Sequence, residues 1–486
     1  MIQPTQEKFA ELSAQGFVVP VYRELPADLE TPLSVFLKLR RPGEPAFLLE
    51  SVEKGQSVGR YSFLGTNLSL LLRLQGDRVE LAEGGEQPLA GRDPLELLRQ
   101  AMGRFKAVPL PGLHGFWGGA VGFLGYDAIR RFEPVGPGQP DDLGLPEALF
   151  HLCRQSVLFD HVAQRMYAVV AVEPGGDYQA AVAELNDLGA RLARPLEFHP
   201  QHGAIEDTEE RHNQTREEYM RGVERIREHI AAGDIFQAVL SRRLERRSSA
   251  DPVNLYRALR ILNPSPYMFF LDFGEFQLIG SSPEALVKLD GRTAETHPIA
   301  GTRPRGRDVE HDHALEQELL ADPKERAEHV MLVDLGRNDL GRVCSYGSVH
   351  VPQFMEVERF SHVMHIVSRV QGELRPDCDG FDLVRAAFPA GTVSGAPKIR
   401  AMQILDELEP TRRGIYAGAV GYFGFWGNLD TCIAIRTILR RGDRVYLQAG
   451  AGIVADSDPA TEYQETVAKL EALKKALEMA EGSMLR

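Results

Sequence analysis

Residues 321–343 carry charged and apolar side chains at the spacing of an amphipathic helix. Asp322 is suited to cap the N-terminus of this helix, and Pro323 to be its first residue. Glu325 and Glu328 lie three residues apart, so the pattern places both carboxylates on one face. The apolar positions of the helix, which we expect to be buried, are Ala327, Val330, Met331 and Leu335.

A second predicted helix begins near Thr461 and runs to about Ala480. It repeats the same feature, because Glu462 and Glu465 are again three residues apart and Thr461 can cap the N-terminus of the helix. Two helices that each present a carboxylate pair could close around a hard divalent cation such as Mg²⁺. Each pair taken alone is also typical of a solvated first helical turn.

The rest of the pattern mixes strands with helices without strict βαβ alternation. Residues 115–126, rich in glycine and aromatics, are predicted to form a strand with close backbone neighbours. Later in the chain we expect a helix over residues 215–232 and then a strand over residues 234–247. Three further strands are expected in succession, over residues 417–425, 430–439 and 444–451.

This order of elements predicts an α+β fold, a layered sandwich of large antiparallel β-sheets flanked by helices. At 486 residues the chain exceeds one ordinary core, so we expect two associated subdomains. A polar stretch between about residues 198 and 215 is interpreted as a linker, which gives an N-terminal part over 1–200 and a second part over 215–486.

Composition narrows the class of protein. The net charge of −14, from 55 basic and 69 acidic side chains, argues against a nucleic-acid footprint. No apolar run is long enough to cross a bilayer, and no secretory signal is visible, so we expect a cytoplasmic protein without a membrane partner. The four cysteines lie far apart with no CxxC pair, which disfavours disulfides and a zinc site; they are Cys153, Cys344, Cys378 and Cys432.

Three segments rich in glycine, hydroxyl or guanidinium groups are candidates for anion binding. Residues 448–454 let backbone N–H groups approach a ligand, and residues 297–306 offer a hydroxyl and two guanidinium groups. Residues 388–398 open a helix and are suited to an anion or to simple capping. No Ser/His/Asp triad or activated cysteine is evident, so covalent acyl chemistry is not indicated.

Several long motifs, in fixed order, resemble those of the chorismate-utilising enzymes, and within that family the large synthase subunits that form anthranilate. The resemblance covers essentially the whole chain and is densest over residues 233–473. The motifs that carry it are residues 48–51, 280–284, 298–306, 325–343, 391–398 and 448–465.

The resemblance implies roles for the acidic pairs and for the segments around them. Glu328 and Glu465 would hold Mg²⁺ directly, whereas Glu325 and Glu462 would hold its waters, and the metal would bind the ring carboxylate of chorismate. Cationic donors for the enolpyruvyl carboxylate would come from two of the substrate contacts, Arg436 and Lys469. The full set of substrate contacts that the resemblance implies is Gly301, Thr302, Tyr416, Arg436, Gly450, Ala451, Gly452 and Lys469.

It also implies the catalytic groups and the reaction. Glu284, beside Thr392, would act as a general acid on the departing ring hydroxyl, and His365 matches the histidine associated with loss of pyruvate. Ammonia would add to the ring, and elimination of pyruvate would give anthranilate, the first committed step of tryptophan biosynthesis. Ala300 and Gln237 stand where related aminodeoxychorismate and isochorismate synthases carry lysines.

The resemblance further implies two partners. No cysteine lies in a Gly-x-Cys-x-Gly elbow, so ammonia is expected from a separate glutamine amidotransferase subunit, in a heterotetramer. Tryptophan is expected as a feedback inhibitor bound in the N-terminal regulatory domain and its junction, at Ser51, Pro266, Tyr267 and Met268. Two alternatives are kept: an aminodeoxychorismate synthase of folate biosynthesis and a catalytically silent, tryptophan-sensing relative.

Overall fold

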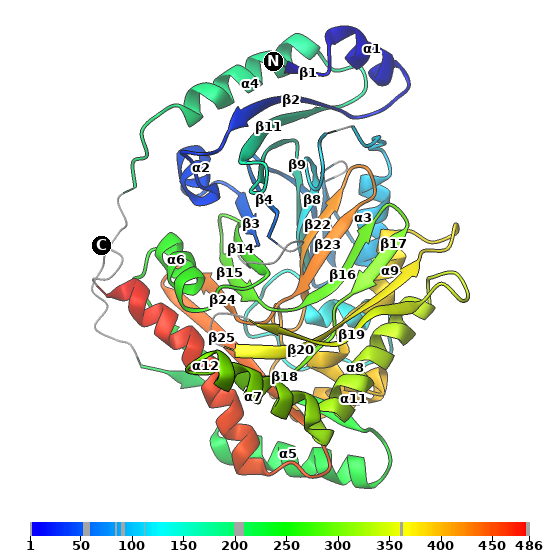
Figure 1. Cartoon of the computed structure of the whole chain (residues 1–486), viewed down its shortest axis with the longest axis vertical. Helices are drawn as coiled ribbons and strands as arrows, with labels where there is room; N and C mark the ends of the chain where they lie inside the picture. Colours follow the sequence, from blue (N-terminus) through cyan, green and yellow to red (C-terminus); the bar gives the residue numbers. More distant parts are fainter. Residues whose placement is uncertain are drawn as a thin grey trace.

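The computed structural model describes residues 2–51, 59–82, 85–88, 93–110, 112–198, 209–359 and 363–482. Two large antiparallel sheets form the body of the molecule, and helices cover them (Figure 1). This confirms the α+β sandwich that the sequence predicts. In Figure 1 the N-terminal helices lie at the top and the last helix runs along the lower left side.

The first sheet contains strands from both parts of the chain. Its order is β1 (Ile2–Gln3), β2 (Val19–Pro26), β11 (Arg165–Val172), β10 (Gln155–Asp160), β4 (Tyr61–Thr66), β3 (Ala46–Glu50), β14 (Tyr267–Asp272), β15 (Gln277–Ser282), β24 (Thr437–Arg441), β25 (Arg444–Ile453), β13 (Gln237–Arg247) and β12 (Arg211–His212), with β21 (Gly395–Ala396) paired to β13. The join between the two parts is the antiparallel pair β3–β14.

The second sheet is shared in the same way. Its order is β18 (Ile299–Pro304), β20 (Val363–Glu373), β17 (Thr293–Thr296), β16 (Ala285–Asp290), β23 (Leu429–Ile433), β22 (Ala419–Gly424), β8 (Gly119–Leu124), β9 (Ala148–Cys153), β5 (Ser69–Gln75), β6 (Arg78–Leu81) and β7 (Gly85–Pro88), with β19 (His350–Arg359) paired to β20. Here β8 pairs with β22. The predicted parts 1–200 and 215–486 are therefore hydrogen-bonded to each other in both sheets.

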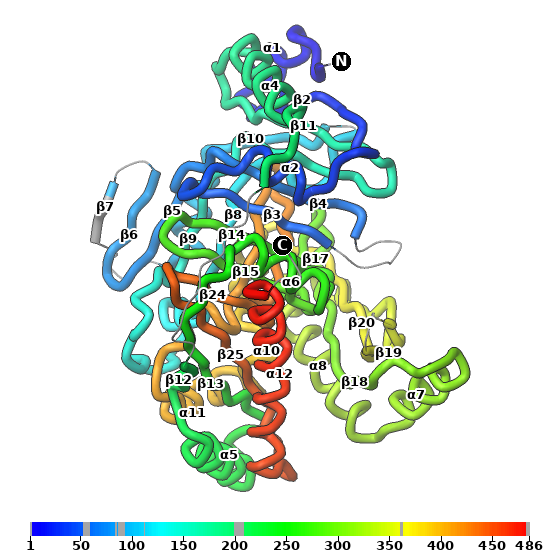
Figure 2. The backbone as a smooth tube through the Cα atoms, turned by 90° about the vertical axis from the view of Figure 1, so that its left-hand side faces the viewer, coloured from blue at the N-terminus to red at the C-terminus, as the bar shows by residue number. Residues whose placement is uncertain are grey.

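The helices are α1 (Gln6–Ala14), α2 (Pro32–Leu39), α3 (Pro94–Met102), η1 (Tyr126–Arg131), α4 (Tyr178–Leu192), α5 (Arg216–Ala231), α6 (Pro252–Leu262), α7 (Val309–Ala321), α8 (Pro323–Gly341), α9 (Gly380–Ala387), α10 (Gly391–Ser394), α11 (Lys398–Leu408) and α12 (Pro459–Glu481). Helix α12 packs on β25, α5 and α6, so it runs along the first sheet (Figure 2). In the described part of the chain, none of the helices combines the length and the apolar character needed to cross a membrane.

The strand expected over residues 430–439 is wrong, because the chain leaves one sheet for the other within it. β23 ends at Ile433 in the second sheet, and β24 begins at Thr437 in the first. Between them Arg436 has a φ of 51°, in the left-handed region. Ala434 and Ile435 continue the apolar run of β23, and the two polar residues after them, Arg436 and Thr437, are too short an interruption to mark the break in the hydrophobic pattern.

The buried face of α8 also differs from the prediction. Ala327 and Val330 are exposed, whereas Met331 and Leu335 are only half-buried. The face that packs on the protein consists of His329, Leu332, Val333, Gly336 and Leu340. A polar and a glycine residue belong to the true stripe, and a pattern of apolar residues alone therefore misplaces it.

The linker expected near residues 198–215 is only partly within the described residues, since residues 199–208 lie outside them. Its last part is ordered secondary structure. Arg211 and His212 form β12, which pairs with β13, and Thr215 caps α5 in a capping box with Glu218.

Close backbone approach at the β8 glycines is confirmed and gives a stability prediction. A Cβ built on Gly122 would lie 2.0 Å from the carbonyl oxygen of Leu149 on the paired strand. We expect Gly122→Ala to lower the free energy of unfolding by about 3 kcal/mol, because main-chain atoms cannot move aside. The measurement is denaturant-induced unfolding.

The matched control is Gly189→Ala on α4, where a new Cβ would meet only the Arg23 side chain at 3.6 Å. Alanine favours a helix over glycine by up to about 1 kcal/mol, so this variant should be as stable as the parent or slightly more stable. Equal losses in the two variants would contradict the close approach at Gly122.

Candidate active site

The predicted substrate residues lie where the two sheets meet α8 and α12. β18 and β20 of the second sheet pack under α8, and β25 of the first sheet packs under α12. Gly301 and Thr302 lie on β18, His365 on β20, and Gly450 on β25. Segments far apart in the sequence are thus brought to one place.

His365 is held by the bulged end of β18. Its Nδ1–H donates to the carbonyl oxygen of Gly301 at 2.9 Å and lies 3.0 Å from Thr302 Oγ1. The register of β18 and β20 shifts between Ala300 and Thr302, and Gly301 there has a φ of 67°. Because a carbonyl oxygen can only accept, Nδ1 carries the proton and Nε2 keeps its lone pair.

The histidine is neutral near pH 7. Burial lowers the pKa of His365, the Gly301 carbonyl offsets part of this, and the positive charge of Arg436 lowers it further. The last effect also shows that Arg436 lies within electrostatic reach of His365. The arrangement provides a neutral imidazole base within electrostatic reach of a guanidinium group.

Arg436 and Tyr416 form the other side of the site, against the glycines of β25. A Cβ on Gly450 would lie 3.0 Å from Tyr416 Oη, and one on Gly452 would lie 2.5 Å from Gln237 Nε2. Burial raises the pKa of Tyr416 to about 12, so its hydroxyl stays protonated. Both glycines therefore keep space that a side chain would fill.

Ala451 differs from its neighbours on β25, because its side chain is fully buried. It packs in the core with residues of α5 and α11, so only its backbone is available to a ligand. The guanidinium of Arg436 has no ion pair with any described residue. Burial lowers its pKa, and Tyr416 and Glu465 oppose this. A carboxylate ligand would supply the missing counter-charge.

The four predicted metal ligands lie on two helices whose charges affect each other. Burial raises the pKa of Glu328, and the negative charges of Glu325 and Glu465 raise it further, against Lys324 and Lys469. Burial also raises the pKa of Glu462, and Glu465 contributes to this rise. Negative charge is therefore in excess here, a condition that a bound cation would relieve.

The carboxylates do not form a ready metal cage. Within the ranges that the structure describes, no three acidic, histidine or cysteine side chains are arranged to hold a metal ion. Glu325 pairs with Arg303 Nη1 at 3.0 Å, and Glu465 with Lys469 Nζ at 2.7 Å. The donor chemistry, oxygen-only with excess negative charge, fits a hard divalent cation that displaces these two side-chain cations.

Lys469 links the second acidic pair to the glycine strand. Its Nζ donates to the carbonyl oxygen of Gly450 at 2.8 Å while it pairs with Glu465. The ammonium group thus contacts both a predicted metal ligand, Glu465, one turn earlier on α12, and a predicted substrate contact, Gly450, on β25.

Glu284 lies between β15 and β16, where the chain crosses from the first sheet to the second. Its carbonyl oxygen accepts from the N–H of Ile433 at 3.0 Å. With Thr392 it lines a small cavity of about 40 Å³. Burial raises the pKa of Glu284 to about 8, and the Thr392 hydroxyl offsets part of the rise. The carboxyl group is therefore protonated at neutral pH and can donate a proton.

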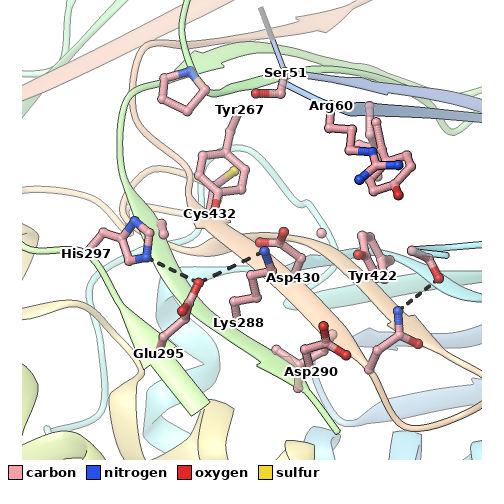
Figure 3. Close-up of a pocket in the computed structure, with 18 of the residues that line it drawn as sticks. Ser51, Arg60, Tyr267, Lys288, Asp290, Glu295, His297, Tyr422, Asp430 and Cys432 are labelled. Atoms are coloured by element: carbon pink, nitrogen blue, oxygen red, sulfur yellow. Dashed lines mark hydrogen bonds and ion pairs between the residues drawn. The ribbon is translucent and has the colours of Figure 1, made fainter. Parts of the chain in front are cut away.

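A separate, larger cavity of about 760 Å³ lies between the two sheets and is lined by all four residues of the predicted effector site (Figure 3). Tyr267 and Met268 come from β14, and Ser51 directly follows β3. The Ser51 hydroxyl is buried without a hydrogen-bond partner in the described part of the protein. A polar ligand group in the cavity would satisfy it.

Sequence reasoning missed two sets of residues. Lys288, Glu295, His297 and Asp430 form a polar group on the floor of this cavity, with Glu295 3.3 Å from His297 (Figure 3). Polar residues in such strands are predicted from sequence to face solvent. Here they line a cavity because the other sheet covers them. The buried His329 is the other omission. Arg303, one of the two guanidinium groups expected to bind an anion, instead pairs with Glu325 and the capping Asp322.

Comparisons with known proteins are consistent over nearly the whole chain. Residues 44–475 match the model of a family described as chorismate binding enzyme. The chain is 47% identical to anthranilate synthase component 1 of Aquifex aeolicus, with 98% of each protein covered. It is 46% identical to the protein of that name from Pseudomonas putida, with 98% of this chain and 99% of that protein covered.

Solved structures agree with this. The crystal structure of anthranilate synthase component I from Streptococcus pneumoniae superposes with a TM-score of 0.76 at 36% identity, covering 92% of this chain and 98% of the other. The menaquinone-specific isochorismate synthase of Escherichia coli superposes with a TM-score of 0.72 at 20% identity, covering 97% and 98%, and shows likeness of fold.

The raised pKa of Glu284 predicts a pH-dependent stability. The carboxyl group has an ordinary pKa of 4.5 and a pKa of about 8 in the fold, so folding favours the protonated form. The contribution of the Glu284 carboxyl group to the free energy of unfolding is complete below its ordinary pKa and is lost as the pH rises through its pKa in the folded protein. Glu284→Gln cannot ionise, so its free energy of unfolding should gain on the parent by up to about 1.4 kcal/mol per pH unit within this window.

Denaturant unfolding at a series of pH values measures this difference. Glu11→Gln on the exposed side of α1 is the control and should run parallel to the parent. Parallel curves for Glu284→Gln as well would mean that this carboxyl group titrates near its ordinary value.

Proposed function

The chain belongs to the family of chorismate-binding enzymes, and we propose that it converts chorismate and ammonia to anthranilate and pyruvate. The observation that carries this proposal is the near-complete coverage of proteins named anthranilate synthase component 1 at 46–47% identity. The charges of the candidate site suit the reaction, since chorismate carries two carboxylates and loses a hydroxyl group.

Binding of the substrate divides between the two sides of the site. Glu328 and Glu465 would hold Mg²⁺ directly and Glu325 and Glu462 through water, and the ion would bind and orient the ring carboxylate. Arg436 and Lys469 would take the enolpyruvyl carboxylate, because both are cationic and Arg436 has no counter-ion among the described residues. The backbones of Gly301, Thr302 and β25 would line the ring between them.

The chemistry then needs one acid and one base. Protonated Glu284 donates to the C4 hydroxyl, which leaves as water while ammonia forms the new C–N bond at C2. In the second step the ring loses its C2 proton and the ether bond to the enolpyruvyl group breaks, which makes the ring aromatic. The group leaves as the enolate of pyruvate, which takes up a proton at its methylene carbon to become pyruvate. The Nε2 lone pair of His365 serves as the acceptor of the C2 proton.

The residues at two positions favour this reaction over those of relatives. Ala300 is buried and has no amine to attack the substrate, and Gln237 beside Gly452 is no base for activating water. External ammonia therefore remains as the nucleophile. Aminodeoxychorismate synthase is the second candidate, with a non-aromatic product. A silent tryptophan sensor would need to have lost an active-site group, and all of the predicted groups are present.

Ammonia requires a source outside this chain. All four cysteines are buried and free, and burial raises the pKa values of the Cys153, Cys344 and Cys432 thiols, so these are poor nucleophiles. We therefore propose a separate glutamine amidotransferase subunit, in a heterotetramer. Buried free thiols also suit a reducing cytoplasm, which we propose as the location.

Tryptophan is proposed as the inhibitor, bound in the 760 Å³ cavity between the sheets. The residues that line this cavity come from both parts of the chain, because Ser51 follows β3 and Pro266 precedes β14. This gives the N-terminal part, residues 1–200, a regulatory role beside the catalytic part. A ligand there would favour one relative arrangement of the two walls.

The direct test is an anthranilate fluorescence assay with chorismate and Mg²⁺. Ammonium should support turnover by the chain alone, glutamine should not, and a chelator should abolish the signal. Equal turnover with glutamine would remove the separate amidotransferase. A non-aromatic amino product would identify an aminodeoxychorismate synthase, and no turnover would favour the silent relative.

The effector proposal predicts the effect of filling its cavity. Ser51→Phe should raise the tryptophan concentration for half-inhibition by at least about tenfold, since a lost contact worth about 1.4 kcal/mol weakens binding tenfold. Turnover without tryptophan should persist. Ser51→Ala, which removes only the hydroxyl, is the milder comparison, and full sensitivity in Ser51→Phe would contradict the assigned site.

A further inference from the structure

We infer that His329 is a positioning residue: its hydrogen bond to Ser368 fixes the first turn of α8, and with it Glu325 and Glu328, against the strand that carries His365. The inference rests on the proposed function, because it concerns the two metal ligands of α8. His329 is fully buried, and its Nε2 lies 2.6 Å from Ser368 Oγ on β20.

The place of His329 on α8 is what gives it this role. The buried stripe of the helix ends toward its N-terminus at His329, and Glu325 lies one turn further along the same face. Glu328 is the adjacent residue. The other members of the stripe are Leu332, Val333, Gly336 and Leu340, which pack through non-directional contacts. Within this stripe the bond from His329 to Ser368 is the directional contact, and together with the ion pairs of Arg303 to Asp322 and Glu325 it fixes how far the first turn slides or rotates on the sheet.

Ser368 connects that bond to the rest of the site. Its N–H donates to the carbonyl oxygen of Pro298 at 3.1 Å, directly before β18, and its Oγ accepts from the N–H of Met355 at 2.9 Å. Ser368 lies three residues after His365 on β20. One serine therefore links the metal-ligand helix, the segment leading to Gly301, and the strand of His365.

The hydrogen bonding of the imidazole runs through Nε2. Its Nδ1 is buried without a partner among the described residues, whereas Nε2 lies 2.6 Å from Ser368 Oγ. A serine hydroxyl can both donate and accept, so it pairs with either neutral form of the ring. The Ser368 hydroxyl thus joins the ring on one side and the N–H of Met355 on the other.

A packing role and a positioning role make different predictions for two substitutions. Leucine fills much of the same buried space but forms no hydrogen bond. Glutamine places an amide N–H₂ near the position of Nε2 and can restore the bond. If His329 only fills space, His329→Leu will be the better substitute; if it positions α8, His329→Gln will be.

The experiment compares the Mg²⁺ response of His329→Leu, His329→Gln and Ser368→Ala with that of the parent. Two readouts are measured: the Mg²⁺ concentration for half-maximal turnover with ammonium, and the Mg²⁺-induced rise in the Tm without substrate. Loss of a residue that orients metal ligands costs about 10–100-fold in metal affinity. We expect about tenfold for His329→Leu and Ser368→Ala, and a value near the parent for His329→Gln.

Two controls separate this from a general loss of stability. Ser156→Ala removes another buried serine bond, from Ser156 Oγ to the carbonyl oxygen of Trp117 at 2.9 Å, far from α8. It should lower the Tm and leave the Mg²⁺ response unchanged. The double variant of His329→Leu with Ser368→Ala should show the Mg²⁺ response of Ser368→Ala alone, since the bond that the two residues share can be lost only once.

The outcomes distinguish the inference from the function beneath it. A parent protein with no Mg²⁺ response, or a Glu328→Gln variant with an unaltered one, overturns the metal proposal and this inference together. A normal parent response that His329→Leu and Ser368→Ala both retain overturns the inference alone. Should His329→Leu fail to fold, the pair His329→Gln and Ser368→Ala still decides it.

Discussion

The crossing of the chain between the two sheets at Ala434–Arg436 is the constraint on which the site depends. It joins β23, whose neighbours are β16 and β22, to β24, whose neighbours are β15 and β25. The crossing is tied on both sides, by Ile433 N–H to Glu284 and by Ser281 N–H to the Arg436 carbonyl oxygen. A non-glycine residue at positive φ costs about 1–3 kcal/mol, which these surrounding contacts must offset. The acid Glu284 and the cation Arg436 are placed by this one segment.

Around that crossing the site is built from opposed charges rather than from a prepared cage. The negative charges of Glu325 on α8 and Glu465 on α12 both raise the pKa of Glu328, and Arg303 and Lys469 pair with Glu325 and Glu465. These cations keep the helices from repelling one another when no other cation is bound. The same two contacts must yield when a divalent ion enters, so ion binding and rearrangement of side chains are coupled.

Much of the fold followed from the hydrophobic pattern, and the reason is local. Helices α5 and α12 were predicted to within about two residues, because regular spacing marks them, although the N-cap of α12 is Asp458 and not the expected Thr461. The crossing after Ile433 was missed because Ala434 and Ile435 continue the apolar run and Arg436 interrupts it only briefly. The buried face of α8 was misplaced because its key member, His329, is polar and finds its partner on a strand distant in sequence.

The site was reached from the sequence in two unequal ways. The acidic pairs follow from i, i+3 spacing, which is visible in one chain. Their meeting across α8 and α12 was one of two interpretations that the spacing allowed, and the neighbours of His365 depend on tertiary contacts that spacing does not encode. The resemblance to a family favoured the shared site. The polar floor of the large cavity, with Lys288, Glu295 and Asp430, was indicated neither by residue spacing nor by the resemblance to a family.

The sharing of both sheets between the two parts of the chain has a consequence for how the protein is made. While the first 200 residues leave the ribosome, one edge of β3 and one edge of β8 are unpaired, because their partners β14 and β22 are translated much later. Such pairing between distant segments raises contact order and slows folding. Open strand edges also invite pairing with other nascent chains. The N-terminal part therefore completes both sheets only after β22, which ends at Gly424, has been synthesised. Its folding depends on strands from the C-terminal half of the chain.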